Sequence, residues 1–338
     1  MQTAAIPSWQ SRRPWMPPQP TWSMSRDQQL HLCERRFYFQ YLAAARLSGG
    51  TDQQRRIAIL KKVKTIQMWQ GESFHWAVAR YLNMIREDQI IFADQLLSSL
   101  REKMEREWRF SEQRRYRDQP MLIGREGVAL FEHEYNVTSE DTVDTAYEFV
   151  RQLVDRFITW VKSSSELSRK ISRADGIWIE PPAFGVDAPG ITLDGVQVIT
   201  KVDLALQMSG ESFEIYDWKT GKAPPYRTTR ISHNDFQVMV YQLWPHVKLR
   251  VPLELISANL VYFGGTAAEQ QKFCMDEEAL ASTTRMVRNS IALAQRWQKN
   301  FATGAMQLSD LDYAAAANIC RQCSFKALCH ESVSLIPL

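Results

Sequence analysis

The sequence lacks the features that mark exported or membrane-spanning proteins. Its 338 residues contain no run approaching the roughly 18 apolar residues that a membrane helix requires. The Trp- and Pro-rich beginning has no apolar core of the kind found in signal peptides. Cysteine is scarce and odd in number, with five residues, which argues against a disulfide framework. These absences favour a globular, cytoplasmic protein with reduced thiols and no membrane partner.

An excess of charge of one sign is also missing. The chain has 41 Lys and Arg against 38 Asp and Glu, which gives a formal net charge of +3. So small a charge does not by itself predict a nucleic-acid partner, because phosphate binding depends on a local basic surface. No P-loop of the form G-x-x-x-x-G-K-[ST] occurs, so any helicase activity would belong to a partner. The length allows one elaborated domain or two ordinary ones.

The cysteines that are present are unevenly placed. Cys320, Cys323 and Cys329 lie close together, and Cys33 stands near the other end of the chain. Clustered thiols in a reduced protein indicate metal or cluster ligands, and Cys33 is the natural fourth ligand of a tetrahedral site. Zinc and a [4Fe-4S] cluster both suit four thiolates, and either would join the chain ends and stabilise the fold. Cys274 follows Phe273 in an expected strand, where we expect a small buried residue.

Hydrophobic periodicity predicts helices in the first half of the chain and strands in the second. After an extended tail over residues 1–22, helical patterns cover 25–46, 54–92, 94–117 and 140–170. Runs at 176–180, 196–206 and 212–219 predict strands of one sheet, and further strands are expected at 255–263 and 272–275. Helices are expected at 234–244, capped by Ser232 and ended by Pro245, and at 276–302.

Two expected strands carry the residues with the clearest chemistry. Asp203 lies in V-D-L-A-L, and Asp217 and Lys219 lie in Y-D-W-K. If these strands are antiparallel neighbours, the two aspartates can face each other, and alternation puts Asp217 and Lys219 on one face. Mg or Mn would offset the like charges of the two carboxylates and polarise a phosphodiester. Lys219 would orient a water molecule or stabilise negative charge on the phosphoryl oxygens. The alternative is an exposed hairpin with these side chains on its solvated face.

Other side chains are candidates for the same site. Gln237 and Tyr241 lie four residues apart, so they share one helix face and could position Lys219 or touch a nucleotide backbone. His75 could be a further ligand, since imidazole accepts Mn readily. Glu180 could add a carboxylate. Ordinary helix positions, a structural histidine and an exposed strand end explain these residues as well.

The ordered set of motifs resembles a known family. It consists of His75, Asp203, D-W-K at 217–219 and Q-V-M-V-Y at 237–241, bracketed by Cys33 and C-x2-C-x5-C. It resembles the RecB-like branch of the PD-(D/E)XK nuclease superfamily, and in particular the CRISPR-associated RecB-like iron-sulfur exonucleases and the AddB nuclease domain. The resemblance implies an α/β (α+β) fold with a restriction-endonuclease-like central mixed sheet flanked by helices. It also implies one domain over 23–338, with a helical elaboration at about 86–175, a nuclease core at about 176–265 and a cluster-binding end at about 276–330.

The resemblance also implies roles for individual residues. The metal ligands would be His75, Asp203, Asp217 and the backbone carbonyl of Trp218. The catalytic set would be Asp203, Asp217, Lys219, Gln237 and Tyr241, with Tyr241 also contacting DNA. A [4Fe-4S] cluster would be held by Cys33, Cys320, Cys323 and Cys329.

These roles together predict a Mg- or Mn-dependent deoxyribonuclease. We expect it to act on single-stranded DNA or DNA ends in repair, recombination or CRISPR adaptation, with a helicase or adaptation complex as partner. Arg227, Arg230 and the basic stretch 55–64 are candidate phosphate contacts, and solvated faces are the alternative. The competing hypothesis is a non-catalytic iron-sulfur DNA-binding or structural subunit.

Overall fold

A five-stranded mixed sheet lies at the centre of the structure, a computed structural model that describes residues 21–43, 51–89, 92–163, 165–184, 188–210, 212–224 and 232–330. The strand order is β10-β9-β8-β7-β4, and β8 and β9 are the parallel pair. The strands are β4 (Gly176–Ile179), β7 (Leu204–Gln207), β8 (Phe213–Lys219), β9 (Ile256–Tyr262) and β10 (Glu269–Phe273). The expected mixed α/β class is confirmed.

The sequence predicted that the whole stretch 196–206 forms a strand of this sheet, but only its last part does. Its first part is β6 (Val196–Ile199), which joins β1 (Thr21–Trp22) and β5 (Gly190–Leu193) in a separate three-stranded sheet. The central sheet takes up only the part from Leu204 onward. Just before that point, the carboxylate of Asp203 accepts the backbone N–H of Trp218 at 2.6 Å. Where the backbone pairing of β7 with β8 stops, the Asp203 side chain thus takes the place of a backbone acceptor.

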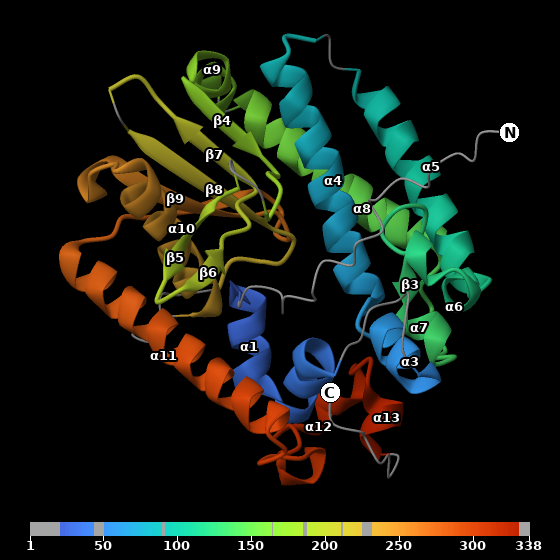
Figure 1. Ribbon diagram of the computed structural model, residues 1–338. Helices are drawn as coiled ribbons and strands as arrows, with labels where there is room; N and C mark the ends of the chain where they lie inside the picture. The colour runs from blue at the N-terminus through green and yellow to red at the C-terminus, as the bar shows by residue number, and fades with distance from the viewer. Residues whose placement is uncertain are drawn as a thin grey trace, which may run out of the picture.

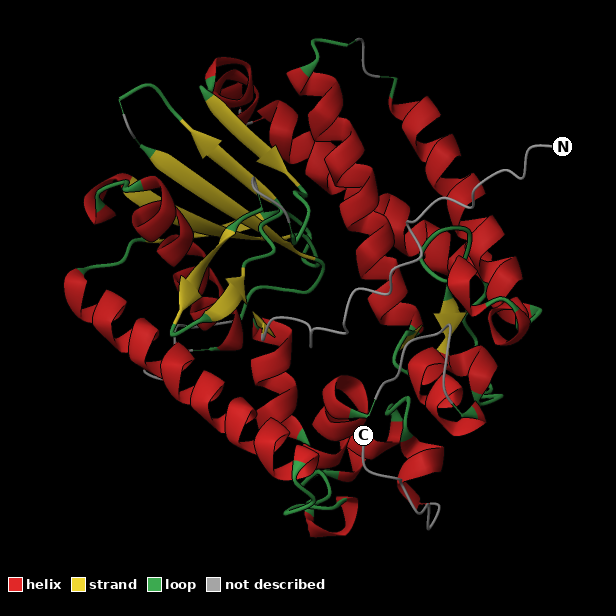
Figure 2. Ribbon diagram, viewed as in Figure 1, coloured by secondary structure: helices red, strands yellow, loops and turns green. Residues whose placement is uncertain are grey.

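Helices cover both faces of the central sheet (Figures 1 and 2). One face packs on α4 (Ile66–Arg86), α5 (Ala93–Glu112), α8 (Val143–Ser163) and α9 (Ser165–Arg173) through a single buried cluster. The other packs on α10 (His233–Leu249) and α11 (Glu277–Ala302) through a second cluster. Successive residues of β8 alternate between the two clusters, because side chains of a strand point to opposite faces. Trp218 therefore faces the α8 side, and Ile215 faces α10.

A third cluster joins the first and last described segments of the chain (Figure 1). The first comprises α1 (Met24–Leu32), α2 (Glu34–Phe37), a π-helix (Tyr38–Leu42) and α3 (Asp52–Leu60), and the last comprises α12 (Ala317–Arg321) and α13 (Lys326–His330). Phe39 stacks on Phe325 with ring centroids 5.3 Å apart. Arg35 Nε donates to the carbonyl of Leu311 at 3.0 Å. Packing and hydrogen bonds between these segments thus hold the cysteine-bearing regions together.

The remaining described elements are short. They are β2 (Val63–Lys64), which pairs with β3 (Ala129–Leu130), the helices α6 (Arg115–Asp118) and α7 (Phe131–Glu134), and 3-10 turns at Pro120–Leu122, Leu253–Leu255 and Leu308–Asp310. None of the described helices is long and apolar enough to cross a membrane.

Several predicted boundaries were wrong. The helix expected over 25–46 is interrupted at Cys33, whose extended backbone separates α1 from α2. The helix expected over 54–92 is two helices, because β2 pairs with β3 between them. Pro245 does not end α10, which runs to Leu249; Trp244 and Pro245 are buried against the core, and the turn after them is largely exposed. Cys274 follows the end of β10 and is exposed, so it is not a buried residue.

Candidate active site

The two aspartates and the lysine meet where β7 begins and β8 ends. Leu204 of β7 is opposite Tyr216 of β8, and the same register continues to Asp203 opposite Asp217. Lys219 is two residues beyond Asp217, so alternation places both on the α10 face. The structure therefore brings the three residues together as the strand pattern suggested, and both carboxylates are buried.

His75 reaches the same place from α4. Its Nδ1 lies 3.2 Å from Asp203 Oδ1 and 3.2 Å from Glu180 Oε1. Burial lowers the pKa of this imidazole, but the Asp203 and Glu180 carboxylates outweigh burial and raise it well above 6.5. Ligand atoms of His75, Glu180 and Asp203 all lie within 4.8 Å of one another. One imidazole and two carboxylates thus converge on a point where a cation would satisfy all three, a donor set that suits Mn²⁺ or Mg²⁺.

Glu180 is the residue of this group that sequence reasoning ranked lowest. It follows β4, and its φ of +43° lies in the left-handed region that glutamate rarely adopts. Its backbone N–H donates to the carbonyl of Asp203 at 3.0 Å, which fixes the turn beside the aspartate. A strained backbone at this point aims the carboxylate toward His75. No signal in the sequence pointed to that conformation, because β4 and β7 become neighbours only in the folded sheet.

Asp217 is the most deeply buried acid of the site, at 3% exposure. Burial, and then the charge of Asp203, raise its pKa from 3.8 to about 6, against the opposing effect of Lys219. Lys219 Nζ lies 2.6 Å from Asp217 Oδ2, but this oxygen has no well-aligned hydrogen bond to any described residue. The contact is therefore an ion pair that leaves Asp217 Oδ2 without a well-aligned hydrogen bond. A buried oxygen of this kind is expected where a carboxylate is placed to bind a ligand.

Lys219 is held from α10. Gln237 accepts a hydrogen bond from Lys219 Nζ at 2.8 Å and donates one to Tyr241 Oη at 2.6 Å. Burial and the charges of Asp217 and Asp203 raise the pKa of Tyr241 well above 10, so it remains a neutral phenol. The four-residue spacing of the glutamine and tyrosine thus produces a continuous chain of hydrogen bonds that fixes the ammonium.

Trp218 contributes to the site through its backbone and to the core through its side chain. Its N–H binds Asp203, which turns the other carboxylate oxygen toward His75. Its indole lies on the opposite face of the sheet, with ring centroids 5.3 Å from Phe157 and 5.8 Å from Trp160. That aromatic cluster fixes the end of β8 and with it the residues on either side of Trp218.

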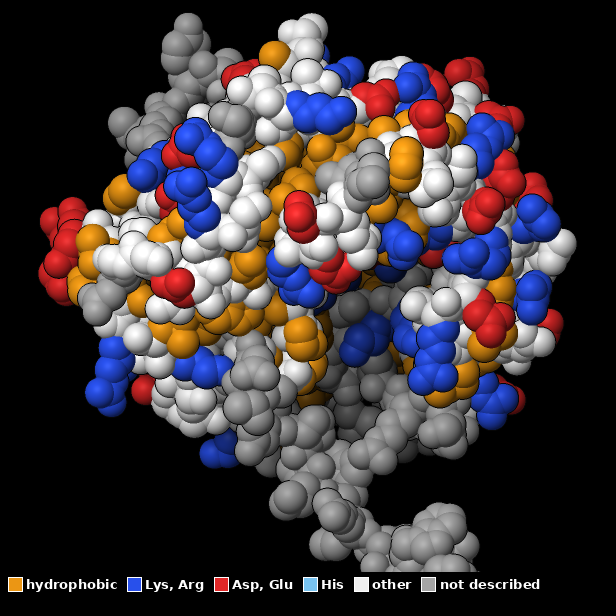
Figure 3. Space-filling view, turned by 90° about the horizontal axis from the view of Figure 1, so that it is seen from above, with side chains coloured by type: hydrophobic (Ala, Val, Ile, Leu, Met, Phe, Trp, Pro, Cys, Tyr) orange, Lys and Arg blue, Asp and Glu red, His pale blue; other side chains and the backbone are white. Residues whose placement is uncertain are grey.

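The predicted phosphate contacts are not assembled at this site by the described residues. Arg227 and Arg230 lie outside the described residues. In the stretch 55–64, Lys64 forms an ion pair with Glu72, and Arg55 lies on an exposed surface beside Asp52. Basic side chains nevertheless border the hollow between the sheet-bearing half and the helical half, as Figure 3 shows.

The four clustered cysteines line one small cavity. Cys33 comes from the junction of α1 and α2, and Cys320, Cys323 and Cys329 come from α12, α13 and the turn between them. All four are free thiols. Arg35, Arg36 and Lys326 line the same cavity and would offset the negative charge of a tetrathiolate group. The donor set and its surroundings fit a group bound by four cysteines.

The fold and the site together define a class of protein: a mixed sheet whose adjacent strand ends carry two acids and a lysine, with a histidine and a further acid completing a cation-binding set. The chain belongs to the PD-(D/E)XK nuclease superfamily, whose family model matches residues 21–330. Members of this superfamily use divalent metals, in agreement with the donor set.

Solved structures with some similarity to the chain are distant. A candidate exonuclease from Eubacterium rectale has 12% identity and a TM-score of 0.44, with 94% of this chain and 90% of that one covered. The protein SSO0001 has 12% identity and a TM-score of 0.30, with 60% and 80% covered. No protein with curated annotation matches the chain.

Proposed function

We propose that the protein is a Mg²⁺- or Mn²⁺-dependent DNA exonuclease that acts on single-stranded DNA or DNA ends. Within its superfamily we assign it to the RecB-like branch, on its resemblance to the CRISPR-associated iron-sulfur exonucleases and the AddB nuclease domain. The observation that supports this most directly is the convergence of His75, Glu180 and Asp203 beside the Asp217–Lys219 pair. Repair, recombination or CRISPR adaptation is the corresponding context, with a helicase or adaptation complex as partner.

Metal binding would use His75, Asp203, Asp217 and the carbonyl of Trp218, with Glu180 as an added ligand. The bound cation supplies Lewis-acid activation of a phosphodiester and of a water. Before it binds, His75 carries a proton between two carboxylates, and the pKa of Asp217 is about 6. These protons must leave as the cation enters, so metal affinity rises with pH over the range in which they dissociate.

Lys219 acts on the substrate from a fixed position. Gln237 holds its ammonium from one side and Asp217 from the other, at 2.8 and 2.6 Å. A fixed ammonium stabilises negative charge on phosphoryl oxygens and orients an attacking water without reorganisation during the reaction. Tyr241, a neutral phenol, keeps Gln237 in the orientation that accepts from Lys219. Gln237 and Tyr241 are therefore positioning residues in this proposal.

For the four-cysteine cavity we propose a [4Fe-4S] cluster. Four thiolates suit either a tetrahedral zinc ion or a [4Fe-4S] cluster. The resemblance to the RecB-like iron-sulfur nucleases favours the cluster. The cluster would add to the contacts between α1–α2 and α12–α13, consistent with one nuclease domain over residues 23–338.

Cleavage of labelled DNA tests the nuclease proposal. The wild-type protein is incubated with single- and double-stranded DNA and Mg²⁺ or Mn²⁺, beside Lys219→Met and the matched surface variant Lys162→Met. We expect metal-dependent cleavage that Lys219→Met loses by about 100-fold or more and Lys162→Met keeps. No cleavage by the wild type, or equal cleavage by both variants, contradicts the proposal and favours a non-catalytic binding subunit.

Metal analysis tests the cluster. Anaerobically purified protein should be brown, absorb in the visible range and contain iron and not zinc. Cys329→Ser should lose iron and melt at a lower temperature, whereas Cys274→Ser, at an exposed position outside the cavity, should keep both properties. Zinc in place of iron would show that the four thiols hold a single ion.

A further inference from the structure

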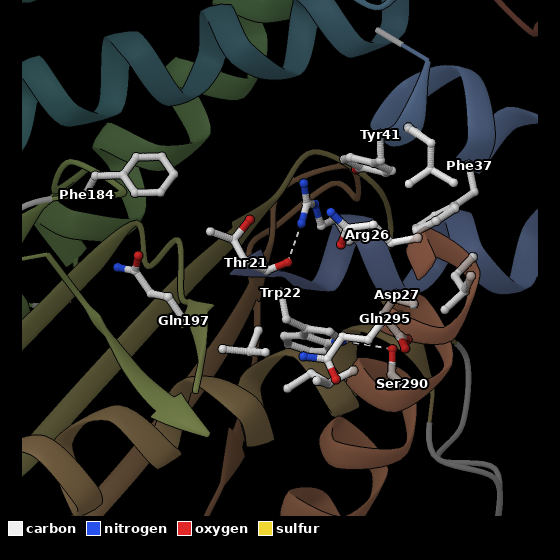
Figure 4. A pocket seen from close by; sticks show the side chains of 16 residues that line it. Thr21, Trp22, Arg26, Asp27, Phe37, Tyr41, Phe184, Gln197, Ser290 and Gln295 are labelled. Atoms are coloured by element: carbon white, nitrogen blue, oxygen red, sulfur yellow. Dashed lines mark hydrogen bonds between the residues drawn. The ribbon is translucent and has the colours of Figure 1, made fainter. Parts of the chain in front are cut away.

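A second cavity, of about 440 Å³, lies away from the cation-binding residues. It is bounded by β1, α1 and the π-helix on one side and by β6 and α11 on the other (Figure 4). Its volume falls in the range of about 300–1,000 Å³ that is typical of sites for small ligands. The family model and the proposed chemistry assign no role to it.

The cavity has a basic and aromatic wall. Arg26 lies with its guanidinium 4.6 Å from the ring centroid of Tyr41 and donates to the carbonyl of Thr21. It forms no ion pair with a carboxylate among the residues that the structure describes. Phe184, 61% exposed, lies on the other side of the opening in Figure 4. A guanidinium that lies over an aromatic ring and has no ion pair among the described residues is suited to an anionic ligand with a flat ring system.

The opposite wall offers hydrogen-bonding groups that are not in use. The side-chain amides of Gln197 and Gln295 line the cavity and form no hydrogen bond within the described part of the chain. By contrast, the indole N–H of Trp22 is satisfied by Ser290 Oγ at 2.8 Å. Amides can both donate to and accept from the edge of a nucleobase.

A second hollow lies between this cavity and the start of α10. This hollow shares Asp27 and Ser290 with the first cavity and reaches His233 at the start of α10. His233 is one turn before Gln237, which binds Lys219. Burial lowers the pKa of His233, and the positive charge of Lys219 lowers it further, whereas the charge of Asp27 raises it. The histidine therefore lies close enough to Lys219 and to Asp27 to be affected by both charges. Oδ1 of Asp27, which lines both hollows, lies 3.6 Å from His31 Nδ1.

We propose that this cavity binds a nucleotide of a single-stranded DNA substrate, beside the hollow that reaches His233. The base would stack on the aromatic side chains and meet the glutamine amides, and Arg26 would contact a phosphate. This inference rests on the proposed nuclease function and deepens it, since it names single strands as the substrate class. A strand separated from its complement can place a base in the cavity without the cost of breaking a base pair.

Binding of single-stranded oligodeoxynucleotides in buffer without divalent metal tests the cavity independently of cleavage. Phe184→Ala removes an exposed ring, and Gln295→Glu puts a negative charge in the cavity wall. The matched controls are Phe149→Ala, at an exposed phenylalanine of α8, and Gln95→Glu, at an exposed glutamine of α5. We expect each cavity variant to raise the Kd about fivefold or more and each control to bind like the wild type. Circular dichroism and Tm establish that all four variants are folded.

The outcomes separate this inference from the nuclease proposal. Unchanged Kd values in both cavity variants, or no binding of single-stranded DNA by the wild type, overturn the inference even if the wild type cleaves DNA with Mn²⁺. Weaker binding by both cavity variants supports it even if no cleavage is found, and in that case the nuclease proposal alone fails.

Discussion

Replacing Asp217 by asparagine should stabilise the protein when no divalent metal is bound. The rise in its carboxyl pKa from 3.8 to about 6 means that the folded state holds the proton more tightly than the unfolded state. Stability contributed by the protonated carboxyl is therefore lost as the pH rises from about 4 through about 6. The difference corresponds to about 3 kcal/mol at pH values above that range, because one pKa unit is about 1.4 kcal/mol.

Asparagine is nearly isosteric with aspartate but carries no charge, so it removes the repulsion from Asp203 and the cost of burying a carboxylate. It also removes the ion pair with Lys219, whose effect is already included in the net rise of the pKa. We therefore expect Asp217→Asn to unfold at a Tm a few degrees above the wild type at about pH 8, and the gain to shrink toward about pH 5. Cleavage by this variant should be lost.

Thermal unfolding with and without Mn²⁺ measures both effects. Added Mn²⁺ should raise the Tm of the wild type at about pH 8 and have much less effect on Asp217→Asn, because a ligand stabilises only the state that binds it. Asp194→Asn is the matched control: this aspartate is exposed, pairs with Arg288 at 3.2 Å and has a φ of +49° that asparagine tolerates. A metal-free Asp217→Asn protein less stable than the wild type at about pH 8 would refute the reasoning.

Three further substitutions probe other parts of the structure. Glu180→Gln should raise the Mn²⁺ concentration for half-maximal cleavage about tenfold, measured by titration of activity, and an unchanged titration would remove Glu180 from the site. Trp218→Ala should lower the free energy of unfolding by about 3–5 kcal/mol, because it empties a buried aromatic cluster, and a urea titration that shows a loss below about 1 kcal/mol would contradict this. Ser232→Ala should cost about 0.5–2 kcal/mol in the same assay, since the serine caps α10 as part of a capping box, and unchanged stability would show that the cap contributes nothing.

Local patterns accounted for much of the candidate site. Alternation along β8 placed Asp217 and Lys219 on one face, and four-residue spacing placed Gln237 and Tyr241 on one helix face. Ser232 was also recognised as a helix cap. These relations follow from backbone geometry within a few residues, which the sequence specifies directly.

Boundaries were less well predicted, because tertiary contacts override local propensity. The helix α10 continues through Pro245, which is itself buried against the core. The run 196–206 divides between two sheets where the Asp203 side chain takes a backbone hydrogen bond. The partner of Asp203 in this hydrogen bond, Trp218, lies 15 residues away in the sequence. Cysteine is usually a buried residue, but Cys274 is exposed just beyond the end of β10.

The sequence by itself determined which residue types could bind metal and phosphate and which of them share a face of one strand or helix. Only the tertiary structure decided that Glu180 reaches His75, 105 residues away, and that Asp27 and Ser290 line both the cavity beside Arg26 and the hollow that reaches His233. The physical reason is that periodicity acts over one or two turns, whereas these contacts depend on how whole helices pack on the sheet.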